Sequence, residues 1–225
     1  MELALDTSTA FASIALSDRG EAVAELTWHS GQNHSRELVP NITHLLDQCN
    51  LDSQSISAVF VAVGPGSFNG IRVGISTAKG LSLSLNVPLI GISSMEVEAY
   101  PFACTGLPLC PIHNAGRNEI ATALYIMNKQ WTRLKEEHIT TIDTLCQHTI
   151  QKTLFCGEIP DETMPIIEKQ LGELAVIPDF SSRLRRASHL ASLGYRRLIK
   201  NEIDNPASLQ PLYLRPPSIT KRKTK

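Results

Sequence analysis

The hydrophobic pattern of the first hundred residues predicts an alternation of strands and helices. Apolar residues alternate or run on in five short stretches, which we predict as strands at 3–5, 12–16, 22–28, 58–63 and 89–92. Helical spacing predicts two amphipathic helices, at 35–49 and 69–85. Ser35 is the predicted N-cap of the first helix, and Pro40 predicts either an early kink or a start nearer Leu38.

The second half repeats this opening. Two strands flank a tight turn at Gly116-Arg117-Asn118, and weaker elements follow. We predict strands at 109–115, 120–127, 152–156 and 174–177, and helices at 143–150, 161–171 and 183–198. Prolines and a glycine interrupt the periodicity at 100–108, so the predicted lobes are 1–103 and 104–225.

The order β-β-β-α-β-α-β is typical of the ribonuclease-H-like unit on which actin-like proteins are built. Its repetition predicts an α/β protein of two such units, an actin-like fold with two lobes.

Composition narrows the class of protein. The chain has 225 residues, 42% of them hydrophobic, and no apolar run long enough to span a membrane. Acidic residues stand where a signal peptide carries a basic segment, so we expect a cytoplasmic protein. The five cysteines form no C-x-x-C pair and the seven histidines never fall three or four apart, which predicts reduced thiols and no metal site.

Charge is unevenly distributed along the chain. Residues 1–180 carry a net charge of −10 and residues 181–225 a net charge of +9. The basic segment includes Arg185, Arg186, Arg196, Arg197 and the tail 221–225. Such a segment attracts phosphates of RNA, but it is also compatible with a solvated helix face and a frayed end, because no aromatic residues interleave the charges.

Two loops are candidate binding elements for a nucleotide. The first is the turn Asp6-Thr7-Ser8-Thr9, where actin-like enzymes hold phosphates and a carboxylate positions magnesium. The second runs from Gly64 to Gly70 between a strand and a helix N-terminus. The predicted nucleotide or phosphate loop consists of Asp6, Thr7, Ser8, Gly64, Gly66 and Ser67.

Each loop also has a purely structural interpretation. The first is a polar turn, and the second is a turn that needs glycine for its backbone and lacks the Gly-Lys-Ser/Thr of a P-loop. The second half should supply another carboxylate, but the equivalent position is Asn114. Beyond the second loop, Gly70, Gly74 and Ala78 predict a smooth helix face that packs against another helix, internal or from a partner.

No catalytic residue stands out. His34 precedes the first helix, where an exposed histidine of the capping region is the more natural interpretation than a base. No Gly-x-Ser-x-Gly elbow or nucleophile with an orienting partner is present.

These motifs together resemble the TsaB (YeaZ) family. The similarity is carried by 3–9, by His34-Ser35-Arg36-Glu37-Leu38-Val39-Pro40, by the loop and helix 64–74, by 78–81 and by 91–94. It is close over the first 95 residues and thins afterwards to 115–119, 156–157 and 211–215.

The resemblance implies a non-catalytic subunit in the synthesis of N6-threonylcarbamoyladenosine at position 37 of tRNA. The family is similar to the transferase TsaD. Residues 92–100 of this chain, however, contain no counterpart of that enzyme's metal-binding His-x-x-x-His. Asn69 and Asn114 replace the family's usual threonine and aspartate, and Asn69 is expected to keep the helix cap.

The implied partners are a TsaD-like transferase and a TsaE-like ATPase, with a homodimer through the same helices and tRNA contact, indirect or through the basic segment, as further expectations. The predicted partner-binding residues are Leu38, Ile42, Leu45, Leu46, Ile71, Gly74, Ile75 and Ala78, although part of this apolar face can pack on the chain's own sheet.

No cofactor is expected for the chain alone, and ATP or ADP with magnesium is expected only in the assembled complex. The alternative is an independent ATP-dependent enzyme of the actin-like superfamily, and Asn114 argues against it. A peptidase would need a metal or a nucleophile that the sequence does not offer.

Overall fold

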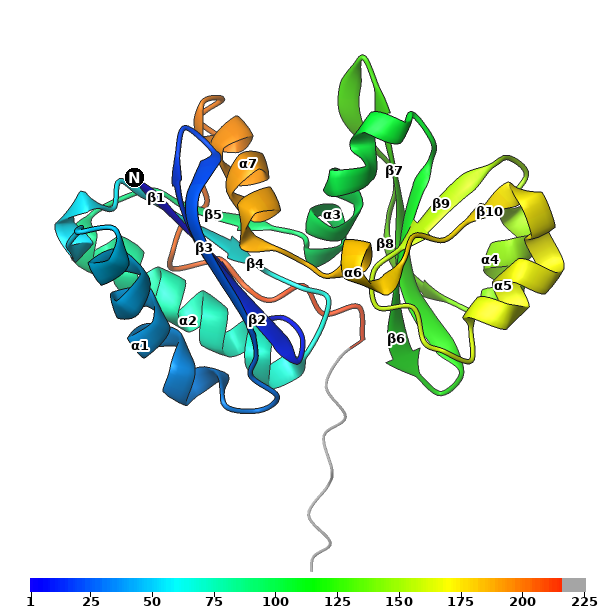
Figure 1. Ribbon diagram of the computed structural model, residues 1–225, viewed down its shortest axis with the longest axis horizontal. Helices are drawn as coiled ribbons and strands as arrows, with labels where there is room; N and C mark the ends of the chain where they lie inside the picture. The colour runs from blue at the N-terminus through cyan, green and yellow to red at the C-terminus, as the bar shows by residue number, and fades with distance from the viewer. Residues whose placement is uncertain (216–225) are drawn as a thin grey trace, which may run out of the picture.

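The computed structural model describes residues 1–215 as two lobes, each built on a five-stranded sheet (Figure 1). The first lobe contains β1 (Glu2–Asp6), β2 (Phe11–Asp18), β3 (Glu21–His29), α1 (His34–Gln48), β4 (Ala58–Ala62), α2 (Phe68–Leu85) and β5 (Leu89–Ile92). The second contains α3 (Ser94–Ala99), β6 (Leu109–Gly116), β7 (Glu119–Asn128), β8 (Gln130–Thr140), α4 (Ile142–His148), β9 (Thr153–Cys156), α5 (Met164–Leu171) and β10 (Ala175–Val176). The short α6 (Phe180–Arg183) and α7 (Ala187–Leu198) follow.

The two sheets have the same topology, which confirms the predicted fold class. Their strand orders are β3-β2-β1-β4-β5 and β8-β7-β6-β9-β10. In each sheet three antiparallel strands come first, and two parallel strands then add on the other side of the first strand. The chain therefore contains one α/β unit twice.

Helices cover both faces of the first sheet. Alternate residues of β1 and β4 point to opposite faces, so Leu3 and Val59 pack under α1 and α2 while Ala4 and Phe60 pack under α7. Helix α7 lies so close that a methyl group on Gly194 would stand 2.3 Å from the Phe60 ring. Both faces of the sheet are shielded from water at β4, and every residue of β4 is buried, which explains its continuous apolar run.

Helix α7 departs from the predicted division of the chain. Residues 187–198 fall in the segment 104–225 that we assigned to the second lobe, yet α7 contacts β1, β2, β3 and β5 of the first sheet. The chain thus crosses between the lobes after β5 and again before α7, and lobe membership does not follow sequence order (Figure 1).

The structure corrects several predicted boundaries. Helix α1 begins at His34 and contains Pro40, its N-cap residue is Asn33, and Ser35 lies inside it. The helix predicted at 183–198 begins only at Ala187, and the short α6 ends at Arg183, where that helix was expected to begin. Strand β8 and helix α3 were not predicted, because β8 is an edge strand rich in charged residues and α3 spans fewer than two turns.

No helix among residues 1–215 is long and apolar enough to cross a membrane.

Candidate functional site

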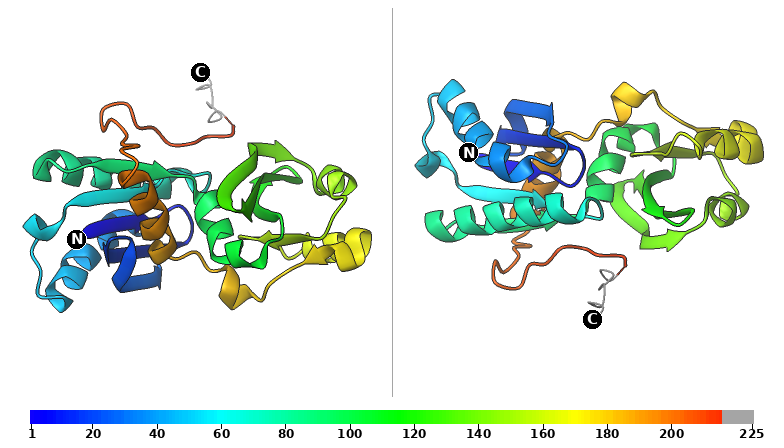
Figure 2. Two further views of the ribbon diagram at one scale, coloured as in Figure 1. Left: turned by 90° about the horizontal axis from the view of Figure 1, so that it is seen from above. Right: turned by 90° about the horizontal axis from the view of Figure 1, so that it is seen from below.

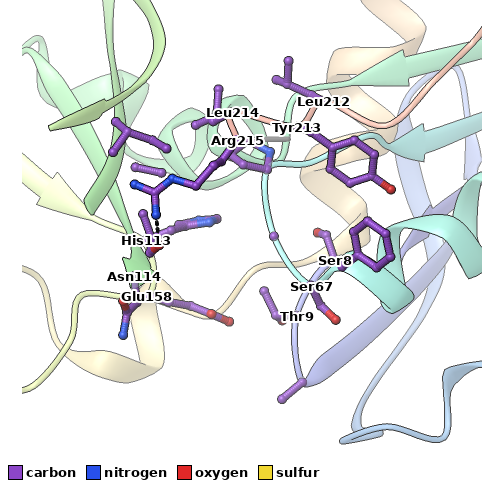
Figure 3. A pocket seen from close by; sticks show the side chains of 17 residues that line it. Ser8, Thr9, Ser67, His113, Asn114, Glu158, Leu212, Tyr213, Leu214 and Arg215 are labelled. Atoms are coloured by element: carbon purple, nitrogen blue, oxygen red, sulfur yellow. Dashed lines mark hydrogen bonds between the residues drawn. The ribbon is translucent and has the colours of Figure 1, made fainter. Parts of the chain in front are cut away.

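A cleft of about 480 Å³ lies between the two lobes, next to the two loops that the sequence predicts as nucleotide-binding elements (Figure 3). Ser8, Thr9 and Ser67 form its wall on the first lobe, and His113, Asn114 and Glu158 form the wall on the second. Residues 212–215 close one side. The structure therefore brings the turn after β1, the glycine loop and Asn114 together around one hollow.

The glycine loop owes its composition to packing against the first turn. A methyl group on Gly66 would stand 2.2 Å from the carbonyl oxygen of Ser8, and one on Gly70 would stand 2.0 Å from that of Thr7. The Ser67 amide donates a hydrogen bond to the Ser8 carbonyl over 2.7 Å. These close approaches support the structural interpretation of the glycines, because no side chain fits between the two loops.

Ser67, not Asn69, caps α2. Its hydroxyl accepts a hydrogen bond from the Gly70 amide at 3.3 Å, while Asn69 lies exposed in the first helical turn. The expectation that Asn69 supplies the cap is therefore wrong, and replacing the family's usual threonine there leaves the cap untouched.

The carboxylate of Asp6 is buried, and groups of the chain itself lie close to both of its oxygens, although Oδ2 has no hydrogen-bond partner of good geometry. One oxygen lies 2.7 Å from Nε of Arg185, and the other accepts hydrogen bonds from the Ser8 amide at 2.9 Å and the Ser8 hydroxyl at 2.5 Å. Asp6 and Arg185 are 2% and 7% exposed. The guanidinium therefore supplies the positive charge that a bound cation would otherwise provide.

Arg185 continues this ion pair into a buried network that joins the lobes. Its Nη1 donates to Glu98 at 3.0 Å, and the other oxygen of Glu98 lies 2.5 Å from Nε2 of His113. Burial alone would raise the pKa of Glu98, but His113 and Arg185 outweigh it and the pKa is lowered. Burial acts likewise against the charge of Arg185, yet Asp6 and Glu98 raise its pKa, so the guanidinium stays charged.

These groups do not fit a magnesium-bound nucleotide. Asp6 is held by an arginine, and Asn114 is exposed and uses its Oδ1 to accept the Gly116 amide at 2.7 Å. Over residues 1–215, no group of three or more histidine, cysteine or acidic side chains is arranged to hold a metal ion. Besides hydroxyls, the charged side chains that line the cleft are Glu158 and Arg215, and the second of these pairs with Glu119.

The predicted partner-binding residues are buried in the chain's own core. Leu38, Ile42, Leu45 and Leu46 of α1 and Ile71, Ile75 and Ala78 of α2 are at most 6% exposed, and they pack on β1, β2 and β4. Gly74 faces the hydroxyl of Thr7, which a methyl group would approach to 2.5 Å. The assignment of these side chains to an interface is corrected: the first sheet already covers them.

Parts of the outer faces of the same helices are exposed to solvent. Val39 of α1 and Leu83 of α2 are 55% and 69% exposed. Gly80 lies on the exposed face of α2, and a methyl group there would meet no atom within 4 Å. The chain's own packing therefore gives no reason for glycine at this position.

Two further expectations are corrected. His34 is buried, not exposed, and its Nε2 lies 2.8 Å from the Thr9 carbonyl, so it attaches α1 to the first turn. Within the basic segment Arg185 is buried in the network, and Arg186 pairs with Glu25. The predicted basic tail 221–225 lies outside the described residues.

Sequence reasoning missed the segment that closes the cleft. The Leu212 amide donates to the Val63 carbonyl at 2.8 Å, and Tyr213 stacks on Phe68 with ring centres 5.2 Å apart. Arg215 pairs with Glu119 of β7, so the segment spans both lobes (Figure 2). The similarity of residues 211–215 to the family indicated that this segment matters, but it did not indicate where the segment lies in the fold. For Glu98, His113 and Arg185 there was no signal at all, since they are far apart in sequence.

The duplicated topology, with a cleft between the two lobes, defines an actin-like α/β protein. In this protein the negative charge of Asp6 is neutralised by Arg185 of the same chain. The same fold occurs in component A of (R)-2-hydroxyglutaryl-CoA dehydratase from Acidaminococcus fermentans, with a TM-score of 0.52, 9% identity and coverage of 88% of this chain and 98% of that one.

Closer similarity identifies the family. Residues 28–175 match the family model described as TsaD, tRNA N6-adenosine threonylcarbamoyltransferase. The chain is 31% identical over 217 residues to the tRNA threonylcarbamoyladenosine biosynthesis protein TsaB of Bacillus subtilis, covering 95% of this chain and 93% of that protein. A Pseudomonas aeruginosa protein described as similar to peptidase YeaZ has a TM-score of 0.81 and 23% identity, covering 96% and 100%. The chain belongs to the TsaB (YeaZ) family, as its motifs predicted.

Proposed function

We propose that the chain is a non-catalytic cytoplasmic subunit in the synthesis of N6-threonylcarbamoyladenosine at position 37 of tRNA. It binds a TsaD-like transferase and helps to recruit a TsaE-like ATPase. The family relationship supports the pathway. The observation that carries the non-catalytic role is the placement of Arg185 between Asp6 and Glu98.

This placement removes the electrostatic basis of nucleotide chemistry. Phosphoryl transfer in actin-like enzymes relies on carboxylates that hold magnesium near the phosphates. Here an internal arginine already neutralises Asp6, and Asn114 offers no charge. An independent ATP-dependent enzyme is therefore the weaker interpretation, and we place any role for ATP or ADP with magnesium in the assembled complex.

The outer surface of α1 and α2 supports the binding role. Both helices cover the same face of the first sheet, so their exposed faces form one surface (Figure 1). Leu83 is 69% exposed and lies one turn after the exposed Gly80 on α2. Glycine inside a helix costs about 1 kcal/mol relative to alanine, and close approach of a partner's helix gives a reason for it. The same surface serves a homodimer when the transferase is absent.

The test is size-exclusion chromatography with light scattering of the chain, alone and mixed with its cognate transferase. Leu83→Asp and Val39→Asp place a carboxylate on the proposed surface without touching the core. Val23→Asp is the matched control, because Val23 is 58% exposed on β3, away from the two helices. We expect a mixed complex with the wild type and with the control, and its loss with Leu83→Asp.

Two results would refute the proposal. One is the absence of a complex between the intact chain and the transferase. The other is a complex that neither Leu83→Asp nor Val39→Asp weakens. Calorimetric titration of the chain alone with ATP and magnesium tests the proposed non-catalytic role. Saturable binding of ATP by the isolated chain would favour the ATP-dependent enzyme.

A further inference from the structure

A second hollow lies at the junction of the lobes and is lined by α7 and by the turn that joins β7 to β8. Figure 1 shows these two elements at the same end of the molecule. The volume of the hollow is about 480 Å³. The first lobe contributes the last turns of α7 and the residues after it, and the second contributes 127–131 of the β7–β8 hairpin. It shares no residue with the cleft around Ser8 and Asn114.

Cations from both lobes surround this groove. Lys129 lies in the β7–β8 turn, Arg196 lies in the last turn of α7, and Lys200 follows two residues after the end of that helix. All three are exposed, and none makes an ion pair within residues 1–215. Arg197 also lines the groove, where it donates to the Gly91 carbonyl at 2.6 Å.

The acidic residues of the groove offset these charges only in part. Glu96 accepts a hydrogen bond from the Trp131 indole at 2.9 Å, and burial raises the pKa of Glu96 against the opposing effect of that hydrogen bond. Glu202 lies 3.5 Å from Arg197 at the surface. The groove is therefore positively charged, although residues 1–180 as a whole carry −10.

Local structure explains only some of these cations. Arg196 and Arg197 lie in the last turn of α7, where positive charge interacts favourably with the helix dipole. Lys129 has no such reason. It occupies a left-handed backbone position with φ of 61°, a conformation that asparagine and glycine adopt more readily than lysine. A lysine is nevertheless placed there, facing the cations of the other lobe.

We propose that this groove binds the phosphate backbone of tRNA, an inference that rests on the proposed function and gives it a contact surface. Three separate cations without an ion pair in residues 1–215 suit a polyanion whose phosphates are spaced along a backbone. The aromatic side chain of the groove does not read bases, because Trp131 is stacked on Tyr125 with ring centres 5.4 Å apart and its indole nitrogen is bonded to Glu96. The contact is therefore independent of nucleotide sequence.

The experiment is a fluorescence-anisotropy titration of an unmodified tRNA transcript with adenosine at position 37 against the complex of the chain and its transferase, from 50 to 300 mM KCl. The test variant is Lys129→Gln/Arg196→Gln/Lys200→Gln. The control variant Lys135→Gln/Lys152→Gln/Lys169→Gln removes equal charge from exposed positions elsewhere on the second lobe. Each phosphate contact contributes about 0.7–0.9 to the slope of log K against log salt, or roughly five- to eightfold in affinity near 0.1 M.

We expect the test variant to weaken tRNA binding by roughly two orders of magnitude and to reduce the salt slope by about two to three, with the control within a factor of two of the wild type. Equal losses in both variants, an unchanged slope in the test variant, or no tRNA binding by the wild-type complex would overturn the inference. Light scattering of the same samples separates it from the proposed function. If the test variant loses the transferase, the groove is a protein interface and the RNA assignment fails, whereas an intact complex with normal tRNA binding refutes the groove alone.

Discussion

The substitution Arg185→Met tests whether the buried network holds the two lobes together. Methionine keeps much of the length of the side chain and removes the charge. The change leaves Asp6 without its positive partner and leaves Glu98 with His113 only. Asp6, Glu98 and Arg185 are all at most 7% exposed, so water cannot replace the lost interactions.

The expected magnitude follows from this burial. Removing one partner of a buried ion pair costs about 3–5 kcal/mol, since an uncompensated charge remains in the interior. Arg186 provides the control, because it is the next residue and also forms an ion pair, with Glu25, but its side chain is 58% exposed. The side chain of Glu25 is 9% exposed but keeps its hydrogen bond from the Ser188 amide at 2.9 Å, so we expect the loss of this half-exposed pair to cost about 0–1 kcal/mol.

The assay is urea denaturation followed by circular dichroism and by the fluorescence of the two tryptophans. We expect Arg185→Met to lower the free energy of unfolding by about 3–5 kcal/mol, and Arg186→Met by less than about 1 kcal/mol. In the double variant with Asp6→Asn, the two losses should fall short of additivity by about 1–3 kcal/mol. A loss below about 1 kcal/mol for Arg185→Met, or strict additivity with Asp6→Asn, would refute the reasoning.

Three further predictions concern the glycines and the network. Gly66→Ala should destabilise the chain by more than about 1 kcal/mol in the same assay, because its methyl group meets the Ser8 carbonyl and the residue has φ of 157°. Gly80→Ala should stabilise the isolated chain by about 0.4–1 kcal/mol, since the methyl group has open space; a loss of stability would show that the glycine serves the chain's own fold. The pKa of Glu98 is lower in the folded chain, so its stabilisation is present above the unfolded value near 4.5 and is lost as the pH falls through the folded one. Thermal melts from pH 7 to 3 should show this loss, and Glu98→Gln should flatten the acid limb; an identical pH dependence in that variant would contradict the assignment.

The strands and helices of the first lobe could be predicted because local pattern and tertiary role agree there. The run Ala58–Ala62 is apolar throughout, and it lies between α1 and α2 on one side and α7 on the other. Strand β8 could not be predicted in the same way. It is an edge strand whose outward charges hide the alternation on which the prediction depends.

The helix faces show the limit of periodicity. The spacing of Leu38, Ile42 and Leu45 correctly defines an apolar side of α1, but the same spacing serves a sheet below or a partner above. The structure decides in favour of the sheet, and the opposite side of the helices, with Leu83 and Gly80, is the surface that we propose for a partner.

The sequence by itself determined the duplicated α/β fold and the family, because strand and helix periodicity and the motifs 3–9 and 64–74 are local properties of the chain. Tertiary structure alone decided the character of the cleft. The three contacts that join Asp6, Glu98, His113 and Arg185 connect residues 15, 87 and 179 positions apart, so only folding brings these groups within hydrogen-bonding distance. A carboxylate that reads as a magnesium ligand in the sequence is thereby an internal ion pair in the folded protein, because the energy of a buried charge depends on its neighbours in space.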